Sequence, residues 1–228
     1  MGRELGFQLE RIEALTFDCY GTLIDWLSGL RSAIAAMPSL AGCDVEQLLL
    51  DREADELDTE IGPYRPYREV LAISMARAAR RQRCEPTEAE LHQYAESMGA
   101  WPMFDETHEA LIRLKERYRL AILSNVDTDV LDRTVTALDV PFDALITAEQ
   151  LHSYKPAHAH FEVALERLEL DRTQVLHVAQ SLRHDIRPAT TLGWNCAWVN
   201  RLDEWKPDDV HPAFVTANLR ELATELGA

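Results

Sequence analysis

The sequence predicts an α/β protein whose parallel sheet is interrupted by an inserted, mostly helical subdomain. Short apolar runs, typical of strands buried on both faces, alternate along the chain with amphipathic helical patterns, as in parallel sheets covered by helices. One long stretch near the N-terminus breaks this alternation, because it contains helical patterns and no good strand. The composition, 46% hydrophobic and 27% charged over 228 residues, is that of a globular protein.

The predicted strands alternate with the predicted helices. Short apolar runs predict strands at residues 12–17, 119–124, 174–179 and 196–199, and two shorter runs predict further strands around 145–146 and 214–215. Apolar residues at helical spacing predict helices at residues 106–117, 128–138, 161–168 and 184–192. Because helices lie between the strands, the strands are expected to run parallel.

The interrupting stretch is expected to form a cap over the sheet. Its helical runs cover residues 27–36, 45–60, 67–83 and 87–97, and a linker follows at 99–105. We therefore expect a core domain of residues 10–25 and 100–228, and a helical cap subdomain of residues 26–99. Because the insertion follows the first strand, it would cover the carboxyl ends of the strands, where open α/β sheets bind ligands.

Charge and hydropathy limit the partners. A formal charge of −16 disfavours nucleic acid, because such a surface repels phosphate. A small anionic substrate would need a local positive pocket. No apolar run approaches the roughly 20 residues of a membrane helix, and the N-terminal residues 1–6 contain no apolar signal core. We therefore expect a cytoplasmic protein without a membrane partner.

Neither the cysteines nor a histidine pair indicates a special site. The four cysteines are scattered without a Cys-x-x-Cys pair, so free thiols are expected. Cys19 lacks the glycine-rich loop and nearby arginine of a cysteine phosphatase, and a small buried thiol is the better interpretation. His158 and His160 lack convergent partners and alternate out of helical phase, which favours polar residues at a helix start over metal ligands.

Asp18 directly follows the first predicted strand and precedes a turn at Gly21 and Thr22. A carboxylate held there by a rigid element can attack phosphorus or an alkyl carbon and form a covalent intermediate. Taken alone, Asp18 is equally compatible with an aspartate that caps a turn or a helix.

Other polar residues follow later strands in the same way. Ser124 and Asn125 could bind anion oxygens or cap the next helix. Lys155 could neutralise a carboxylate and a substrate anion, although a lone lysine is most often a surface residue. Asp185, by itself, would suit the first turn of a helix. Their order, each at the carboxyl end of a strand, points to one site together with Asp18.

These segments resemble the four ordered motifs of the haloacid dehalogenase superfamily. The resemblance lies in residues 17–23, 123–125, 154–156 and 180–185, and it covers the chain from about residue 13 to residue 199. It implies a Rossmann-like core, a helical cap that closes over the site, and chemistry through an aspartyl-enzyme intermediate. Asp18 would be the nucleophile, and Lys155 and Asp185 the other catalytic residues.

Two departures separate the sequence from the phosphatases of this superfamily. Phosphatases usually have a second aspartate that protonates the leaving group, whereas Tyr20 stands here, with a reference pKa near 10. Their fourth motif contains Gly-Asp for magnesium, whereas Ala179 and Gln180 stand here and only Asp185 remains acidic. Halide leaves unprotonated, and Asp-x-Tyr is the pattern of the (S)-2-haloacid dehalogenases, which the sequence therefore resembles most.

The match to the dehalogenases has gaps. Phe161 stands where they usually have a tyrosine, and Gln180 and Leu182 replace a serine and an asparagine that position the lysine and water. Gln180 could supply the hydrogen bond of the serine, but Leu182 cannot replace the asparagine. Dehalogenases also use a cap arginine for halide and carboxylate. The candidates here are Arg52, Arg65 and Arg68, and Arg52 is the closest by position.

The resemblance implies hydrolytic dehalogenation of small 2-haloacids by a homodimer that requires no cofactor. The substrate-binding residues implied are Tyr20, Thr22, Ser124, Asn125 and Arg52. Two alternatives stay open. One is a magnesium-dependent phosphatase acting on a small phosphate ester, with Asp18, Tyr20 and Asp185 around the metal. The other is a catalytically silent, ligand-binding protein.

Overall fold

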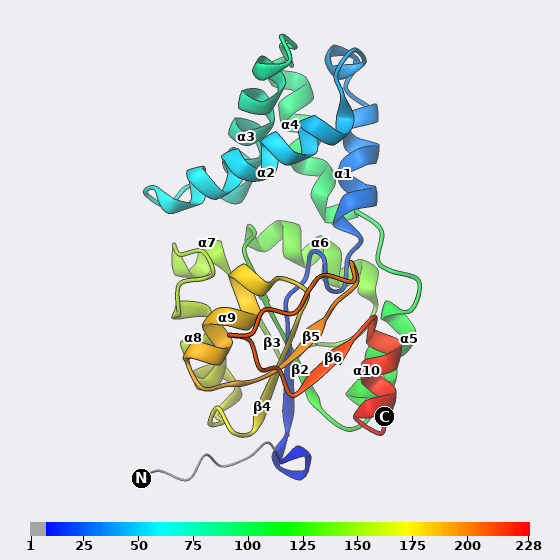
Figure 1. Ribbon diagram of the computed structural model, residues 1–228, viewed down its shortest axis with the longest axis vertical. Helices are drawn as coiled ribbons and strands as arrows, with labels where there is room; N and C mark the ends of the chain where they lie inside the picture. Colours follow the sequence, from blue (N-terminus) through cyan, green and yellow to red (C-terminus); the bar gives the residue numbers. More distant parts are fainter. Residues whose placement is uncertain (1–7) are drawn as a thin grey trace.

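A computed structural model describes residues 8–228, and the sequence-based statement about residues 1–6 falls outside this range. Six parallel strands form one sheet in the order β3-β2-β1-β4-β5-β6 (Figure 1). They are β1 (Ala14–Phe17), β2 (Arg119–Ser124), β3 (Ala144–Thr147), β4 (Val175–Ala179), β5 (Asn195–Val199) and β6 (Phe214–Thr216). This is the Rossmann strand order, so the predicted α/β fold is confirmed.

The apolar side chains of the strands alternate between two cores. In β1, Leu15 and Phe17 pack into one apolar cluster, whereas Ala14 packs into a second cluster on the other face. In β2, Leu120 and Leu123 divide between the same two clusters. Burial on both faces explains why the strands appear in the sequence as continuous apolar runs.

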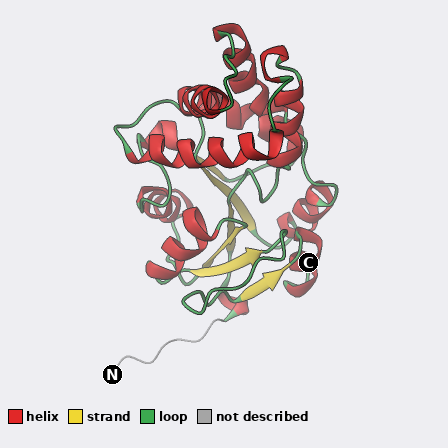
Figure 2. Ribbon diagram, turned by 45° about the horizontal axis from the view of Figure 1, so that its top comes forward, coloured by secondary structure: helices red, strands yellow, loops and turns green. Residues whose placement is uncertain are grey.

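Helices cover the two faces of this sheet (Figure 2). The core helices are α5 (Thr107–Lys115), α6 (Thr128–Leu138), α7 (Ala148–Leu151), α8 (Ala159–Leu168), α9 (Arg187–Thr191) and α10 (Leu219–Glu225). The single helix expected at 184–192 is instead two elements, because a wider π-helical turn, η4 (Leu182–Ile186), precedes α9. In this turn, the Ile186 N–H donates to the carbonyl of Ser181, five residues back.

Four helices lie together beyond one end of the sheet (Figure 1), and they are named the cap below. They are α1 (Trp26–Ala35), α2 (Val45–Ile61), α3 (Tyr67–Arg81) and α4 (Glu88–Ser97). Asp25 and Asp44 accept hydrogen bonds from main-chain N–H groups in the first turns of α1 and α2, which explains where these helices begin. We propose the division between core and cap that the sequence suggests. No helix within residues 8–228 has the length and apolar character of a membrane span.

The prediction of free thiols is wrong for one pair of cysteines, because Cys43 and Cys84 are joined in a disulfide. Cys43 precedes α2 and Cys84 follows α3. The two segments are held together by hydrogen bonds between Asp44 and Gln82, a proximity that no local cysteine spacing reveals. Cys19 and Cys196 are free and buried.

Asp127 connects the core to the cap. Its buried carboxylate, just before α6, accepts hydrogen bonds from the main-chain N–H groups of Tyr67 and Arg68 at 2.8 and 3.0 Å, and from Arg68 Nε at 3.0 Å. The two N–H groups lie in the first turn of α3, where they have no partner within the helix. A carboxylate there satisfies both donors and also suits the positive end of the helix dipole.

Asp127→Ala is therefore expected to lower the free energy of unfolding by about 2 kcal/mol, because it leaves these donors without an acceptor. Asp129→Ala is the matched control. Asp129 also pairs with Arg68 but is 54% exposed, and an exposed ion pair contributes at most about 1 kcal/mol. Denaturant unfolding monitored by fluorescence measures both variants. Equal losses would contradict the role given to Asp127.

Candidate active site

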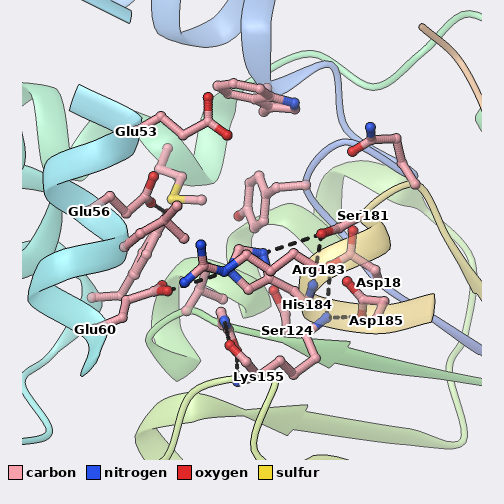
Figure 3. Close-up of a pocket in the computed structure, with 18 of the residues that line it drawn as sticks. Asp18, Glu53, Glu56, Glu60, Ser124, Lys155, Ser181, Arg183, His184 and Asp185 are labelled. Atoms are coloured by element: carbon pink, nitrogen blue, oxygen red, sulfur yellow. Dashed lines mark hydrogen bonds and ion pairs between the residues drawn. The ribbon is translucent and has the colours of Figure 1, made fainter. Parts of the chain in front are cut away.

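The polar residues predicted from the sequence meet at the carboxyl edge of the sheet. Asp18, Ser124, Lys155 and Asp185 all line one pocket, together with cap residues that include Arg52 (Figure 3). The pocket lies where the strand order reverses, between β1 and β4, which is where Rossmann-type sheets bind ligands.

Lys155 lies at the centre of this arrangement. Its ammonium donates to Asp18 Oδ1 at 2.9 Å, to Asp185 Oδ1 at 2.6 Å and to the main-chain carbonyl of Leu123 at 2.8 Å. These three bonds use all three of its N–H donors. The lysine is 1% exposed, so its charge is offset by the two carboxylates and not by water.

The electrostatic environment shifts the pKa values of the two carboxyl groups in opposite directions. Burial opposes the charge of Lys155, but Asp18 and Asp185 raise the pKa of its ammonium. Burial likewise opposes the charge of Asp185, yet Lys155 and a hydrogen bond from His177 lower the pKa of that carboxyl. Burial and the charge of Asp185 raise the pKa of Asp18 above its ordinary value, despite the attraction of Lys155. Asp18 is therefore the carboxylate that takes up a proton first as the pH falls.

Thr22 holds the second oxygen of Asp18. Its hydroxyl donates to Asp18 Oδ2 at 2.8 Å and accepts a hydrogen bond from the main-chain N–H of Gln180 at 3.0 Å. The turn that brings Thr22 back to Asp18 passes through Gly21 at φ +101°, a conformation that favours glycine. The carboxylate is thus fixed at both oxygens.

Asn125 and Ser124 have different surroundings. The side-chain amide of Asn125 accepts from the main-chain N–H of Lys155 at 2.7 Å and donates to the Lys155 carbonyl at 3.0 Å. Asn125 therefore positions the lysine, and one N–H of its amide remains for a ligand. The Ser124 side chain lines the pocket, and no hydrogen bond joins its hydroxyl to another residue within 8–228.

The hydroxyl of Tyr20 lies 2.7 Å from Thr134 Oγ1. Because the Thr134 hydroxyl donates to the carbonyl of Val130, it accepts from Tyr20. Burial raises the pKa of the tyrosine well above 10. Tyr20 therefore lines the pocket as a neutral side chain, and its hydroxyl proton is donated to Thr134.

Of the three candidate cap arginines, only Arg52 lines the pocket. It is 4% exposed, and its Nη2 donates to Glu56 Oε2 at 2.5 Å. Arg65 pairs instead with Glu69, and Arg68 holds Asp127. The Glu56 carboxylate offsets the charge of Arg52 before any substrate binds, which the sequence reasoning did not foresee.

Sequence reasoning also missed His177, a fully buried residue of β4. Its Nε2 lies 3.0 Å from Asp185 Oδ1, and its Nδ1 lies 2.9 Å from Thr16 Oγ1. Because a carboxylate only accepts, Nε2 bears the proton and donates to Asp185. The signal was a lone polar residue within an apolar strand, since buried polar groups need partners. The ring of Phe161 packs edge-on against His177, with ring centroids 5.1 Å apart.

The donor set does not fit a magnesium ion. Both oxygens of Asp18 and one of Asp185 already accept from Lys155, Thr22 or His177. Asp185 Oδ2 is the one of these four oxygens without a partner among the described residues. Magnesium requires near-octahedral oxygen coordination, and no group of three acidic, histidine or cysteine side chains within residues 8–228 is arranged to bind a metal.

His160 is fully buried in the first turn of α8, where burial lowers its pKa to about 3.

Comparisons with known proteins identify relatives of this chain. Haloacetate dehalogenase H-2 of Moraxella sp. (strain B) is 27% identical over 198 residues, which cover 85% of this chain and 88% of that protein. The (S)-2-haloacid dehalogenase of Pseudomonas sp. (strain YL) is 26% identical over 85% of this chain and 84% of its own. The crystal structure of the L-2-haloacid dehalogenase RSc1362 matches with a TM-score of 0.84 at 26% identity, covering 95% of this chain and 99% of that one.

The model of the haloacid dehalogenase-like hydrolase family matches residues 12–193. The chain belongs to this family of enzymes, as the ordered motifs in its sequence predict.

The two buried carboxylates are expected to affect stability in opposite directions. The pKa of Asp18 is raised above 3.8 in the folded protein, so its ionised form costs stability at neutral pH. Asp18→Asn should therefore stabilise the protein near pH 7. The gain should shrink as the pH falls through the raised pKa.

The pKa of Asp185 is lowered, so its charge contributes stability at neutral pH that is lost as the pH falls through the lowered pKa. Asp185→Asn should cost about 3–5 kcal/mol near pH 7, because it breaks a buried ion pair. Denaturant unfolding of both variants, near pH 7 and at lower pH, measures the difference. A change of the same sign in both variants would contradict this description of the site.

Proposed function

We propose that the protein is a hydrolytic dehalogenase, which converts small 2-haloacids into 2-hydroxy acids through an ester on Asp18. The main support is the environment of Tyr20. A phosphate ester needs an acid to protonate its leaving group, but the Tyr20 proton is committed to Thr134 and its pKa is raised. A halide ion leaves without a proton, so carbon–halogen cleavage suits this site.

In the first step, one oxygen of Asp18 attacks the carbon that bears the halogen. The new carbon–oxygen bond forms as the carbon–halogen bond breaks, and the halide departs with the bonding electron pair. Lys155 and Thr22 hold the two carboxylate oxygens, so the nucleophile is oriented before the substrate arrives. Attack from the side opposite the halogen inverts the configuration of that carbon.

In the second step, water attacks the carbonyl carbon of the Asp18 ester. The Lys155 ammonium and the Thr22 hydroxyl, which contact the Asp18 oxygens, are positioned to stabilise the negative charge that develops. Asp185 lines the same pocket, and its buried Oδ2 has no hydrogen-bond partner among the described residues. It therefore suits a water-orienting role. The products are the 2-hydroxy acid, the restored Asp18 carboxylate and a proton released to solvent.

Substrate binding falls to polar groups around the nucleophile. The Ser124 hydroxyl and the buried Nε of Arg52, which lacks a partner among the described residues, can donate to the substrate carboxylate. The remaining amide N–H of Asn125 suits contact with the departing halide. We propose that catalysis requires no metal ion or other cofactor, and that the enzyme acts as a cytoplasmic homodimer without nucleic-acid or membrane partners.

The proposal predicts chloride release from 2-chloropropionate at a rate that EDTA does not change. Asp18→Asn should lower this rate at least about a thousandfold, as expected for loss of a covalent nucleophile. Asp105→Asn, an exposed aspartate outside the pocket, should leave it unchanged. Chloride release is measured beside phosphate release from a panel of small phosphate esters.

Two results would contradict the proposed dehalogenase function. Phosphate release that EDTA abolishes, without chloride release, would identify a magnesium-dependent phosphatase. Absence of turnover on both panels, despite thermal stabilisation by 2-haloacids, would identify a silent ligand-binding protein.

A further inference from the structure

The cap presents a row of carboxylates to the pocket. Glu53, Glu56 and Glu60 line it from α2, and in Figure 3 they lie across from Asp18 and Lys155. Their spacing of three and four residues places them on one face of the helix. The wall opposite the nucleophile is therefore acidic.

The pocket as a whole has an excess of negative charge. Its lining contains five carboxylates and three permanent cations, which are Lys155, Arg52 and Arg183. Two of these cations are already paired, because Lys155 contacts both catalytic carboxylates and Arg52 contacts Glu56. A simple haloacid would bring one more negative charge into this pocket.

The three glutamates differ in the hydrogen-bond and ion-pair partners of their carboxylates. Glu56 accepts hydrogen bonds from Arg52 and from the hydroxyl of Tyr67, so its oxygens have partners. The Glu60 side chain is only 8% exposed, and it has a single ion-pair partner within residues 8–228. Its nearest cation is His184, whose Nε2 lies 3.6 Å from Glu60 Oε2. Glu53 is exposed at the pocket wall.

A largely buried carboxylate with one partner at 3.6 Å is unfavourable, because burial removes much of the water that would solvate its charge. Burial and the neighbouring charge of Glu56 raise the pKa of Glu60, even though His184 opposes this shift. A cationic group in the pocket would satisfy Glu60 and reduce its repulsion from Glu56. A positively charged ligand group would therefore relieve the unfavourable negative charge that the unliganded pocket has around Glu60.

We propose that the natural substrate has an ammonium group, which Glu60 and Glu53 bind at the cap side of the pocket. Together with the proposed dehalogenation, which this inference deepens, the substrate class is the short 2-haloacids with a terminal amine. Such a zwitterion adds no net charge to the pocket. Its carboxylate and halogen end faces Asp18, Ser124 and Arg52, and its amine faces Glu60 and Glu53.

Binding without chemistry tests the amine directly. The ligands are 4-aminobutanoate and pentanoate, which have the same number of heavy atoms and contain no halogen. Isothermal titration of the wild-type protein should show at least about tenfold tighter binding of the amine, as expected for one charge-assisted hydrogen bond. Glu60→Gln should reduce this preference to about threefold or less, and Glu53→Gln should reduce it partly.

Glu46→Gln is the matched control, because Glu46 lies on the same helix, is exposed, pairs with Arg31 and does not line the pocket. It should keep the full preference. Thermal unfolding checks that each variant is folded. Equal or tighter binding of pentanoate, or a preference that survives both Glu60→Gln and Glu53→Gln, would overturn the proposal.

Turnover separates this inference from the proposed function. The matched substrates are 4-amino-2-chlorobutanoate and 2-chloropentanoate, and the amine should have at least about tenfold higher kcat/KM for chloride release. Chloride release at equal kcat/KM would retain the dehalogenase and overturn the amine preference. Tighter binding of 4-aminobutanoate without chloride release from either substrate would support the amine site and overturn the dehalogenase.

Discussion

The Lys155 ammonium is the interaction on which the site depends. Its three hydrogen bonds reach Asp18 after β1, Leu123 in β2 and Asp185 in the turn after β4, so one buried cation connects three segments at the carboxyl edge of the sheet. A cation is stable in such a place only where its partners replace water. The charge of the site therefore depends on the strand order, because this order brings together the two carboxylates that keep the lysine ionised.

The carboxylates around this lysine differ in whether their charge stabilises the folded protein. Asp185 has a lowered pKa and is held by His177, as suits a residue that keeps the lysine in place. Asp18 has a raised pKa, because burial and the charge of Asp185 oppose its ionisation, so its charged form costs stability. The cap contributes a third such group, because the largely buried Glu60 has only His184, at 3.6 Å, as an ion-pair partner among the described residues. Such unsatisfied groups are expected where a ligand completes the structure.

The sequence predicted the fold well where periodicity is strong and poorly where contacts are long-range. The strand at 119–124 and the helix at 128–138 agree with the structure residue for residue, because their apolar patterns are continuous. The Cys43–Cys84 disulfide and the wider turn at Leu182–Ile186 escaped prediction, since neither has a local pattern. In the site, the motif order correctly brought Asp18, Lys155 and Asp185 together. The pairing of Arg52 with Glu56 depends on side-chain packing that spacing alone does not specify.

The central claim is that Asp18 itself attacks the substrate, and a single-turnover isotope experiment tests it most directly. The enzyme, in excess over a 2-haloacid, reacts in water enriched in heavy oxygen, and mass spectrometry follows the product and the Asp18 peptide. The 2-hydroxy acid of the first turnover should contain ordinary oxygen from Asp18, and the carboxylate should take up the heavy isotope. Heavy oxygen in that first product, with an unlabelled Asp18, would mean that water attacks the substrate and would contradict the account.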